Sequence, residues 1–171
     1  REFASPPTIS ARSLAPDATY AAPVISAYMN PAQAASISMA HPEDMMRKLT
    51  RALDLRGFRF LHILSPCPTG WKSEPSEGIE LIRWAVESGL YPVLEIVDGH
   101  EWTVDVEPTF SDRPLKTFLE RQGRFSKSHV DPAAVRSAID RAWLDIRPRL
   151  GPASGAPRAS WRVSGASARA G

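Results

Sequence analysis

Residues 57–71 decide the fold and read Gly-Phe-Arg-Phe-Leu-His-Ile-Leu-Ser-Pro-Cys-Pro-Thr-Gly-Trp. The run from Phe58 to Leu64 is short, aromatic and partly β-branched, and it is bounded by Gly57 and Ser65-Pro66, which predicts a buried strand. The loop Ser65–Trp71 follows the carboxyl end of that strand. Open α/β sheets place their ligands at this end, so the loop is the first place to look for a site.

Working outward, a helix is predicted on each side of the strand. His41-Pro42-Glu43-Asp44 opens a segment with apolar residues at helical spacing that continues until Gly57. Ser76 to Ser88 has the same spacing, with Gly89 as its cap. The alternation of helix and strand predicts the α/β class.

A hairpin and two more helices are predicted downstream. Pro92 to Val97 and His100 to Val106 flank Asp98-Gly99, a dipeptide whose preference for positive φ suits a type I′ turn. A short helix then covers Pro114 to Gln122 and ends at Gly123. The last helix starts at Asp131-Pro132 and carries one apolar stripe, formed by Val135, Ala138, Ile139, Ala142, Trp143 and Ile146.

The two ends of the chain have a different composition. Residues 1–31 carry five prolines, which predicts an extended or loosely ordered segment. Gly, Ala, Ser and Pro make up sixteen of the last twenty-one residues, with Trp161 and Val163 the only large apolar side chains there. We therefore expect an α/β domain at 32–148 and a disordered tail at 149–171.

Charge and composition exclude several classes of protein. The net charge is +2, and residues 151–171 contribute +3, which leaves −1 for residues 1–150 and makes nucleic acid an unexpected partner. No apolar run approaches the ~20 residues that a membrane span needs. Arg1-Glu2-Phe3 does not resemble a secretory signal, and a single cysteine fits a reducing cytoplasm.

Cys67 is the first candidate for chemistry. Prolines on both sides stiffen its backbone, which suits a fixed ligand or a nucleophile, although a buried structural cysteine beside a tight turn is also compatible with the pattern. No Cys or His follows at zinc-finger spacing. A thiolate and base pair of Cys67 with His62 would make a cysteine hydrolase or transferase, but the spacing alone does not bring the two into contact.

The histidines and the acids show no clear catalytic set. His41 is expected at a helix entry and His62 as a hydrogen-bonded residue of the core or sheet, while His100 and His129 stand in separate contexts. Glu77, Glu80 and Glu87 are spaced as a solvated helix face. The acids of the hairpin are expected to protect its edges from pairing: Glu95, Asp98, Glu101, Asp105 and Glu107. Arg121 to Phe125 is expected to be a helix end with cationic side chains near its negative pole.

Together, several runs resemble the beta subunit of pyruvate:ferredoxin oxidoreductase, the subunit that binds thiamine diphosphate. The resemblance covers about residues 24–148. The runs are Leu64 to Trp71 around Cys67, Ile79-Glu80-Leu81 to Pro92, Leu94-Glu95, and Leu119 with Gln122-Gly123-Arg124-Phe125. A further set lies upstream and is similar to the segment before the family's penultimate strand: Ala35-Ser36-Ile37 with Pro42-Glu43-Asp44 and Arg47-Lys48.

The resemblance implies an enzyme that decarboxylates pyruvate or another 2-oxoacid, forms acyl-coenzyme A and passes electrons through a [4Fe-4S] cluster to ferredoxin. It implies that Cys67 supplies one of the cluster's four thiolates and that Trp71 and the loop prolines hold Cys67 in place. Trp71 is more similar to the pyruvate type. The fold it implies is the C-terminal portion of a thiamine-diphosphate-binding α/β layer.

The family's amino-terminal cysteine pair and its Gly-Asp-Gly motif, which holds Mg²⁺ and the diphosphate together with an Asn, have no counterpart in this sequence. We therefore expect the chain to be inactive alone and to work with other subunits or with a cysteine-bearing half. The alternative is a noncatalytic interaction fragment that keeps the fold without the redox role.

Overall fold

The computed structural model describes Ala22, residues 29–126 and residues 130–151. Most of the proline-rich segment expected at 1–31 and most of the expected tail lie outside these residues, as does His129. Residues 149–151, assigned above to the tail, contact the sheet: Leu150 forms a bridge with Trp102, and Gly151 N donates to Trp102 O at 3.1 Å. Ordered contacts thus continue past the expected boundary at 148.

Four strands form one mixed sheet in the order β2-β1-β3-β4. β1 (Gln33–Ser38) runs parallel to β2 (Arg59–Leu64) and antiparallel to β3 (Val93–Val97), and β3 pairs antiparallel with β4 (Glu101–Val106). Helix α3 (Pro42–Asp54) connects the parallel pair, as such a crossover requires. The predicted α/β class is confirmed.

The strand predicted at 58–64 is present, but the prediction that it is buried is wrong. β2 is an edge strand of the sheet, and Phe58 and Ile63 are 47% and 43% exposed. The buried central strand is instead β1, all six residues of which are buried. Its sequence Gln-Ala-Ala-Ser-Ile-Ser has Ile37 as its only β-branched residue and no aromatic residue, so its neighbours largely impose its conformation.

The backbone hydrogen bonds between β1 and β3 end before Ser36, and the side chain of Ser36 bonds to β3 and to the residue before it instead. Backbone pairing runs from Gln33↔Val97 to Ala35↔Glu95. Beyond it, Ser36 Oγ donates to Pro92 O at 2.5 Å and accepts from Leu94 N at 3.0 Å. The two strands can therefore diverge without leaving these buried backbone groups unpaired.

The predicted helices form with small shifts at their ends. After β2 come α4 (Pro68–Trp71), the 3₁₀ turn η2 (Pro75–Glu77) and α5 (Gly78–Glu87); after the hairpin come α6 (Asp112–Glu120), the turn η3 (Gly123–Phe125), α7 (Pro132–Ile146) and the turn η4 (Arg147–Arg149). Asp131 caps α7 as predicted, because its side chain accepts from Ala133 N at 2.9 Å. The hairpin turn also agrees, since Asp98 and Gly99 both have positive φ (48° and 73°).

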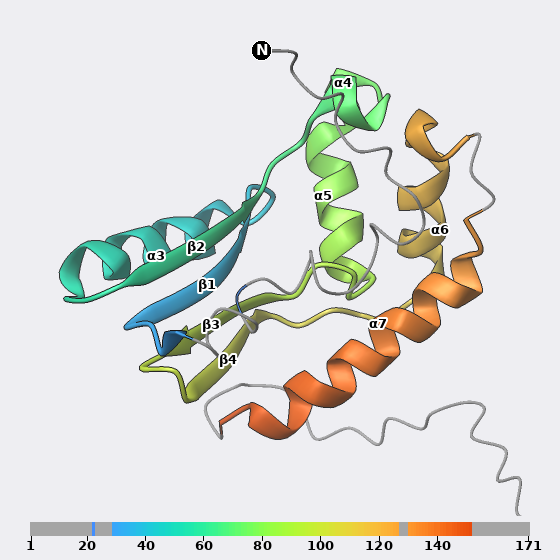
Figure 1. The fold of residues 1–171 in the computed structure, drawn as a ribbon. Helices are drawn as coiled ribbons and strands as arrows, with labels where there is room; N and C mark the ends of the chain where they lie inside the picture. Colours follow the sequence, from blue (N-terminus) through green and yellow to red (C-terminus); the bar gives the residue numbers. More distant parts are fainter. Residues whose placement is uncertain (1–21, 23–28, 127–129, 152–171) are drawn as a thin grey trace, which may run out of the picture.

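The sheet has one apolar face and one charged face. Figure 1 shows α3 on one side of the sheet and α5, α6 and α7 on the other. The main core lies on the side of α5–α7, where Leu94, Ile96 and Trp102 from the hairpin pack with residues of those helices. Ionic groups fill much of the space between α3 and the sheet, as described below. Within the described ranges, no helix has the length and apolar character that a bilayer crossing needs.

Candidate functional site

Cys67 lies in the loop that joins β2 to α5, at the carboxyl end of the parallel strand pair (Figure 1). It is the N-cap of α4, with φ −132° and ψ 84°, outside the helical region that the following proline disfavours. Trp71 N donates to Cys67 O at 2.8 Å, which fixes the loop from the other side. Cys67 is exposed, so the alternative of a buried structural cysteine is wrong. The loop presents a thiol on a stiff backbone.

Three glycines pack closely against this loop, at positions where a larger side chain would clash with it or crowd it. A Cβ on Gly78 would lie 2.8 Å from Pro66 Cβ, and a Cβ on Gly123 would lie 2.9 Å from Lys72 O. Gly123 N also donates to Lys72 O at 3.0 Å, which joins η3 to the end of α4. A Cβ on Gly70 would lie 3.1 Å from Cys67 Sγ. The loop is therefore held between the start of α5 and the turn η3, and Gly70 carries no side chain that would press on the sulfur.

Arg124, in η3, lies beside this loop. Its guanidinium carbon is 5.2 Å from the centroid of the Trp71 ring and 4.5 Å from that of Phe125, both within cation–π range. Its Nε is buried without a hydrogen-bond partner, and no carboxylate of the described residues lies within ion-pair distance of it. Burial lowers the pKa of Arg124 to about 10, and the nearby Cys67 opposes that shift. The expected helix-end role fits Arg121, which pairs with Glu77 at 2.9 Å, better than Arg124.

The Cys67 loop fits a single ligand of a cluster rather than a complete site. The thiol is exposed, Gly70 leaves space over the sulfur, and a positive charge that lacks a carboxylate stands nearby. A [4Fe-4S] cluster is held by four thiolates as a rule. No group of three or more His, Cys, Asp or Glu side chains that could hold a metal occurs among the described residues. Any cluster at Cys67 must therefore draw its other ligands from elsewhere.

The histidines do not form a catalytic pair with Cys67. His62 lies in β2 and packs its ring against Tyr91, with ring centroids 5.5 Å apart. It is a hydrogen-bonded sheet residue, as expected, because its backbone oxygen accepts from Tyr91 Oη at 2.7 Å, while its Nδ1 is buried without a partner among the described residues. Burial lowers the pKa of His62. No hydrogen bond joins it to Cys67 within that part, and the structure gives no support to a thiolate–imidazole pair.

The other described histidines serve local structure. His41 is the N-cap residue of α3, as predicted, and its Nδ1 is 3.0 Å from Ser38 Oγ. Burial and the nearby Arg83 lower the pKa of His41. His100 lies in the hairpin turn, with Nδ1 2.7 Å from Asp98 O.

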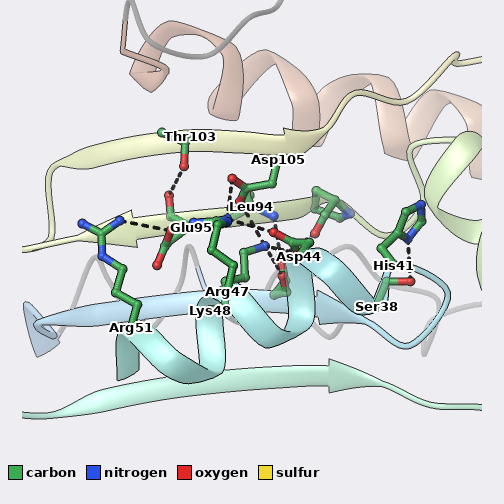
Figure 2. Close-up of polar contacts among 12 residues, drawn as sticks. Ser38, His41, Asp44, Arg47, Lys48, Arg51, Leu94, Glu95, Thr103 and Asp105 are labelled. Carbon is green, nitrogen blue, oxygen red and sulfur yellow. Dashed lines mark hydrogen bonds and ion pairs between the residues drawn. The ribbon is translucent and has the colours of Figure 1, made fainter. Parts of the chain in front are cut away.

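A second polar cluster lies between α3 and the hairpin, and Figure 2 shows its members pointing toward one another. Lys48 is completely buried, and its Nζ donates to Asp44 at 2.8 Å, Asp105 at 3.0 Å and Ser36 O at 2.9 Å. Arg47 contacts Asp44 and Glu95 at 2.8 Å each and Asp105 at 2.7 Å. We call this set, completed by Arg51 and Gln33, the α3 charge network.

The α3 charge network corrects the expectation for the hairpin acids. Glu95 is 1% exposed and lies on β3, which is an interior strand; its carboxylate accepts from Gln33 Nε2 at 2.5 Å and from Arg51 at 3.4 Å. Asp105 is on the edge strand β4, but its carboxylate faces Arg47 and Lys48. Neither acid protects a sheet edge from pairing. Glu80 behaves as expected of a solvated helix residue and pairs with Arg83 on α5.

Burial and the opposite charges act against each other on two members of the network, Asp105 and Arg47. Burial raises the pKa of Asp105, while Lys48 and Arg47 act to lower it. Burial alone would lower the pKa of Arg47, but its bonds to Glu95 and Asp44 outweigh that effect and raise it. The three cations and the three carboxylates balance, so the network attaches α3 to the sheet, although Gln33 Oε1 is buried without a hydrogen-bond partner among the described residues. The sequence gives a signal only for its helical half, in which Asp44, Arg47 and Lys48 share a face.

Comparisons with known proteins came from sequence. No protein-family profile matches the chain. It is similar to the ketoisovalerate oxidoreductase subunit VorB of Pyrococcus horikoshii, with 38% identity over 115 residues, 67% of this chain. It is also similar to the pyruvate synthase subunits PorB of Pyrococcus furiosus (30% over 128 residues, 64% of this chain) and of Methanothermobacter marburgensis (33% over 126 residues, 73%).

The matched part is a minority of each relative. The chain spans 37%, 39% and 43% of the lengths of these three proteins, respectively.

Proposed function

Because the chain belongs, over its matched residues, to the family of pyruvate and ketoisovalerate oxidoreductase beta subunits, we propose that it is the C-terminal part of a 2-oxoacid:ferredoxin oxidoreductase. The proposed enzyme decarboxylates the 2-oxoacid on thiamine diphosphate, transfers the acyl group to coenzyme A and reduces ferredoxin. We propose pyruvate as the substrate, because Trp71 resembles the pyruvate type. The relatives include proteins named for both pyruvate and ketoisovalerate, so the substrate needs its own test.

Cys67 is the residue on which this proposal depends. The observation that carries it is an exposed thiol on a loop held by Pro66, Pro68 and three glycine contacts, beside a desolvated cation. Such a loop presents a thiolate at a fixed position, as a cluster ligand requires. In this role Cys67 binds one iron of a [4Fe-4S] cluster, and the cluster supplies one-electron transfer. The loop itself holds the sulfur in place, and Trp71, which is buried, supports the loop.

The other cofactors are assigned to the parts that complete the subunit. Mg²⁺ and the diphosphate need several oxygen ligands at one place, and the described residues include no group of three acidic or other metal-binding side chains. We therefore propose that the segment bearing the other three thiolates also binds thiamine diphosphate and Mg²⁺. The proposed setting is a multisubunit enzyme of the cytoplasm.

The edge formed by β2 is the proposed contact with that segment. Parallel strands are rarely left open to solvent, yet β2 pairs only with β1 among the described residues. Exposed apolar side chains lie on it and next to it: Leu53 at 84%, Phe58 at 47% and Ile63 at 43%. The relatives are more than twice as long as the matched part, and we propose that a segment equivalent to their unmatched part covers this edge.

The test is anaerobic reconstitution with iron and sulfide, followed by metal analysis and visible absorption. It compares the chain alone with the chain mixed or coexpressed with the cysteine-bearing part. The proposal expects a cluster only in the mixture, and its loss in Cys67→Ala. Thr69→Ala is the matched control, since Thr69 is an exposed residue of the same loop, and it should retain the cluster.

The competing proposal is an interaction fragment without redox chemistry, which the exposed β2 edge also favours. In that case Cys67→Ala leaves the metal content of the mixture unchanged while the two parts still bind each other. A cysteine hydrolase would instead show rapid alkylation of Cys67 at neutral pH and would need a base near the sulfur.

A further inference from the structure

We propose that Arg124 sets the reduction potential of the cluster that Cys67 ligates, by placing one permanent positive charge beside it. This inference rests on the proposed cluster at Cys67. It concerns a residue that binds neither substrate nor metal, and that acts on electron transfer through its charge.

The first step of the argument is that Arg124 is held rather than mobile. Its guanidinium lies over the rings of both Trp71 and Phe125, at 5.2 and 4.5 Å. Trp71 is itself buried and meets Phe118 edge-on, with centroids 6.2 Å apart. The turn that carries Arg124 is joined to the Cys67 loop through the hydrogen bond from Gly123 N to Lys72 O. The distance between the charge and the sulfur is therefore fixed by packing.

The second step is that the charge has no other partner. The strong ion pairs of the chain hold cations against carboxylates at 2.7–3.0 Å, as in the α3 charge network. Arg124 forms no such pair within the described ranges, and its Nε is buried and unsatisfied. Arg124 is partly buried and its Nε has no partner, so an anion supplied at this place would stabilise its charge. Cys67 is the acidic group whose charge acts on it.

The third step is the sign of the effect. A cluster bound by four thiolates is negatively charged and gains one more negative charge when it is reduced. In the proposed enzyme Cys67 would hold the cluster, which would supply one-electron transfer between the 2-oxoacid and ferredoxin, and no bond or proton would change at Arg124. A nearby cation stabilises the reduced form more than the oxidised form. Arg124 thus makes the cluster easier to reduce.

The experiment is a redox titration, monitored by electron paramagnetic resonance, of the complete oxidoreductase containing this chain. The relevant signal is the one that Cys67→Ala abolishes. In Arg124→Gln we expect the ratio of reduced to oxidised cluster at a fixed potential to fall about tenfold, the order that a unit charge exerts over roughly 10 Å at an effective dielectric constant of about 20. For one electron this is a shift of ~59 mV to lower potential.

Two further variants separate charge from structure. Arg124→Lys keeps the charge but not the planar stacking, and it should change the ratio by less than about threefold. Arg121→Gln removes a cation from the same turn, but that side chain is 58% exposed and paired with Glu77, so the ratio should stay within about twofold.

The outcomes distinguish this inference from the function on which it rests. A signal that depends on Cys67 but has an unchanged potential in Arg124→Gln overturns the role of Arg124 and leaves the proposed function intact. An equal shift in Arg121→Gln overturns it as well. A cluster that survives Cys67→Ala overturns both. If Arg124→Gln does not assemble, the Arg124→Lys variant decides, since a tenfold fall there despite the retained charge contradicts the inference.

Discussion

A cation is buried in the α3 charge network and another is partly buried beside the Cys67 loop, but only the network pairs its cation with carboxylates. Lys48 is fully buried and contacts two carboxylates and a carbonyl within 3.0 Å. Arg124 is partly buried against two aromatic rings, with no carboxylate at ion-pair distance among the described residues. The first arrangement pairs each of its cations with a carboxylate of this chain. The second is incomplete, and the difference indicates which of the two regions is built for something that the chain does not itself contain.

The largest expected effect comes from opening the complete network. Lys48→Met removes the fully buried cation and leaves Asp44 and Asp105 with Arg47, which is 45% exposed, as their one cation in the network, and we expect a loss of up to roughly 3–5 kcal/mol in the free energy of unfolding. Urea denaturation of the purified chain measures it. Arg51→Met is the control: this side chain is 43% exposed and reaches Glu95 only at 3.4 Å, so it should cost less than about 1 kcal/mol. Equal losses in the two variants would contradict the network as described.

A smaller loss is expected where the Cys67 loop is clamped. Gly123→Ala places a Cβ 2.9 Å from the carbonyl oxygen of Lys72, and backbone cannot yield as a flexible side chain can. We expect a loss of about 1–3 kcal/mol in unfolding free energy. Gly151→Ala meets nothing closer than 3.8 Å and should stay within about 0.5 kcal/mol of the wild type. If both variants are neutral, the turn and the loop are not held together as inferred.

The comparison becomes sharpest in the variant that removes the unpaired charge. Arg124→Met keeps an apolar side chain against Trp71 and Phe125, loses cation–π contacts of about 0.5–1 kcal/mol each and removes the cost of an unpaired charge. We expect the unfolding free energy to stay within about 1 kcal/mol of the wild type, in contrast to Lys48→Met. A loss above about 2 kcal/mol would mean that Arg124 has a structural partner and would remove the contrast on which the inference depends.

The smallest effect concerns His62, another buried polar group without a partner for its Nδ1. Burial lowers its pKa in the folded state, so the unfolded chain takes up a proton first as the pH falls through the ordinary value of about 6.5. Stability is therefore lost as the pH falls from 7 toward the folded pKa, and the loss then stops. His62→Gln should reduce this decline by a fraction of a kcal/mol. His41 and Asp105 are the same in both proteins, so thermal unfolding at pH 7 and 5.5 isolates the difference; an unchanged decline would contradict it.

Local patterns were sufficient wherever an element carries its own signal. α3, α5 and α7 have apolar residues at helical spacing, and Asp98-Gly99 marks the hairpin turn without reference to the rest of the fold. β1 has no such signal, because Ala34 and Ala35 become strand residues only through pairing with β2 and β3. The burial of β2 was wrong for the same reason, since composition cannot tell a central strand from an edge.

In the candidate site, too, some residues have a local sequence signal and others do not. The flanking prolines and the family resemblance identify Cys67 as a candidate. The resemblance also includes residues 122–125, but nothing in the local sequence indicates that Arg124 lies beside the Cys67 loop. That proximity depends on the hydrogen bond between Gly123 N and Lys72 O, and Lys72 lies 51 residues earlier in the sequence. Likewise Lys48 and Asp105 meet because the sheet register brings β4 over α3. Contacts set by register and packing cannot be read from spacing along the chain.

The α3 charge network also has a consequence for the order in which the protein folds. Gln33 and Glu95 are separated by 62 residues, and Arg47 and Glu95 by 48. While the ribosome is still making the hairpin, α3 can form and β1 can pair with β2, but three cations of the helix have only Asp44 as a carboxylate partner from the network. This face of the sheet can close only after β3 and β4 emerge, because the entropy of a long loop must first be overcome. The charges of α3 thus make its final docking a late event in synthesis.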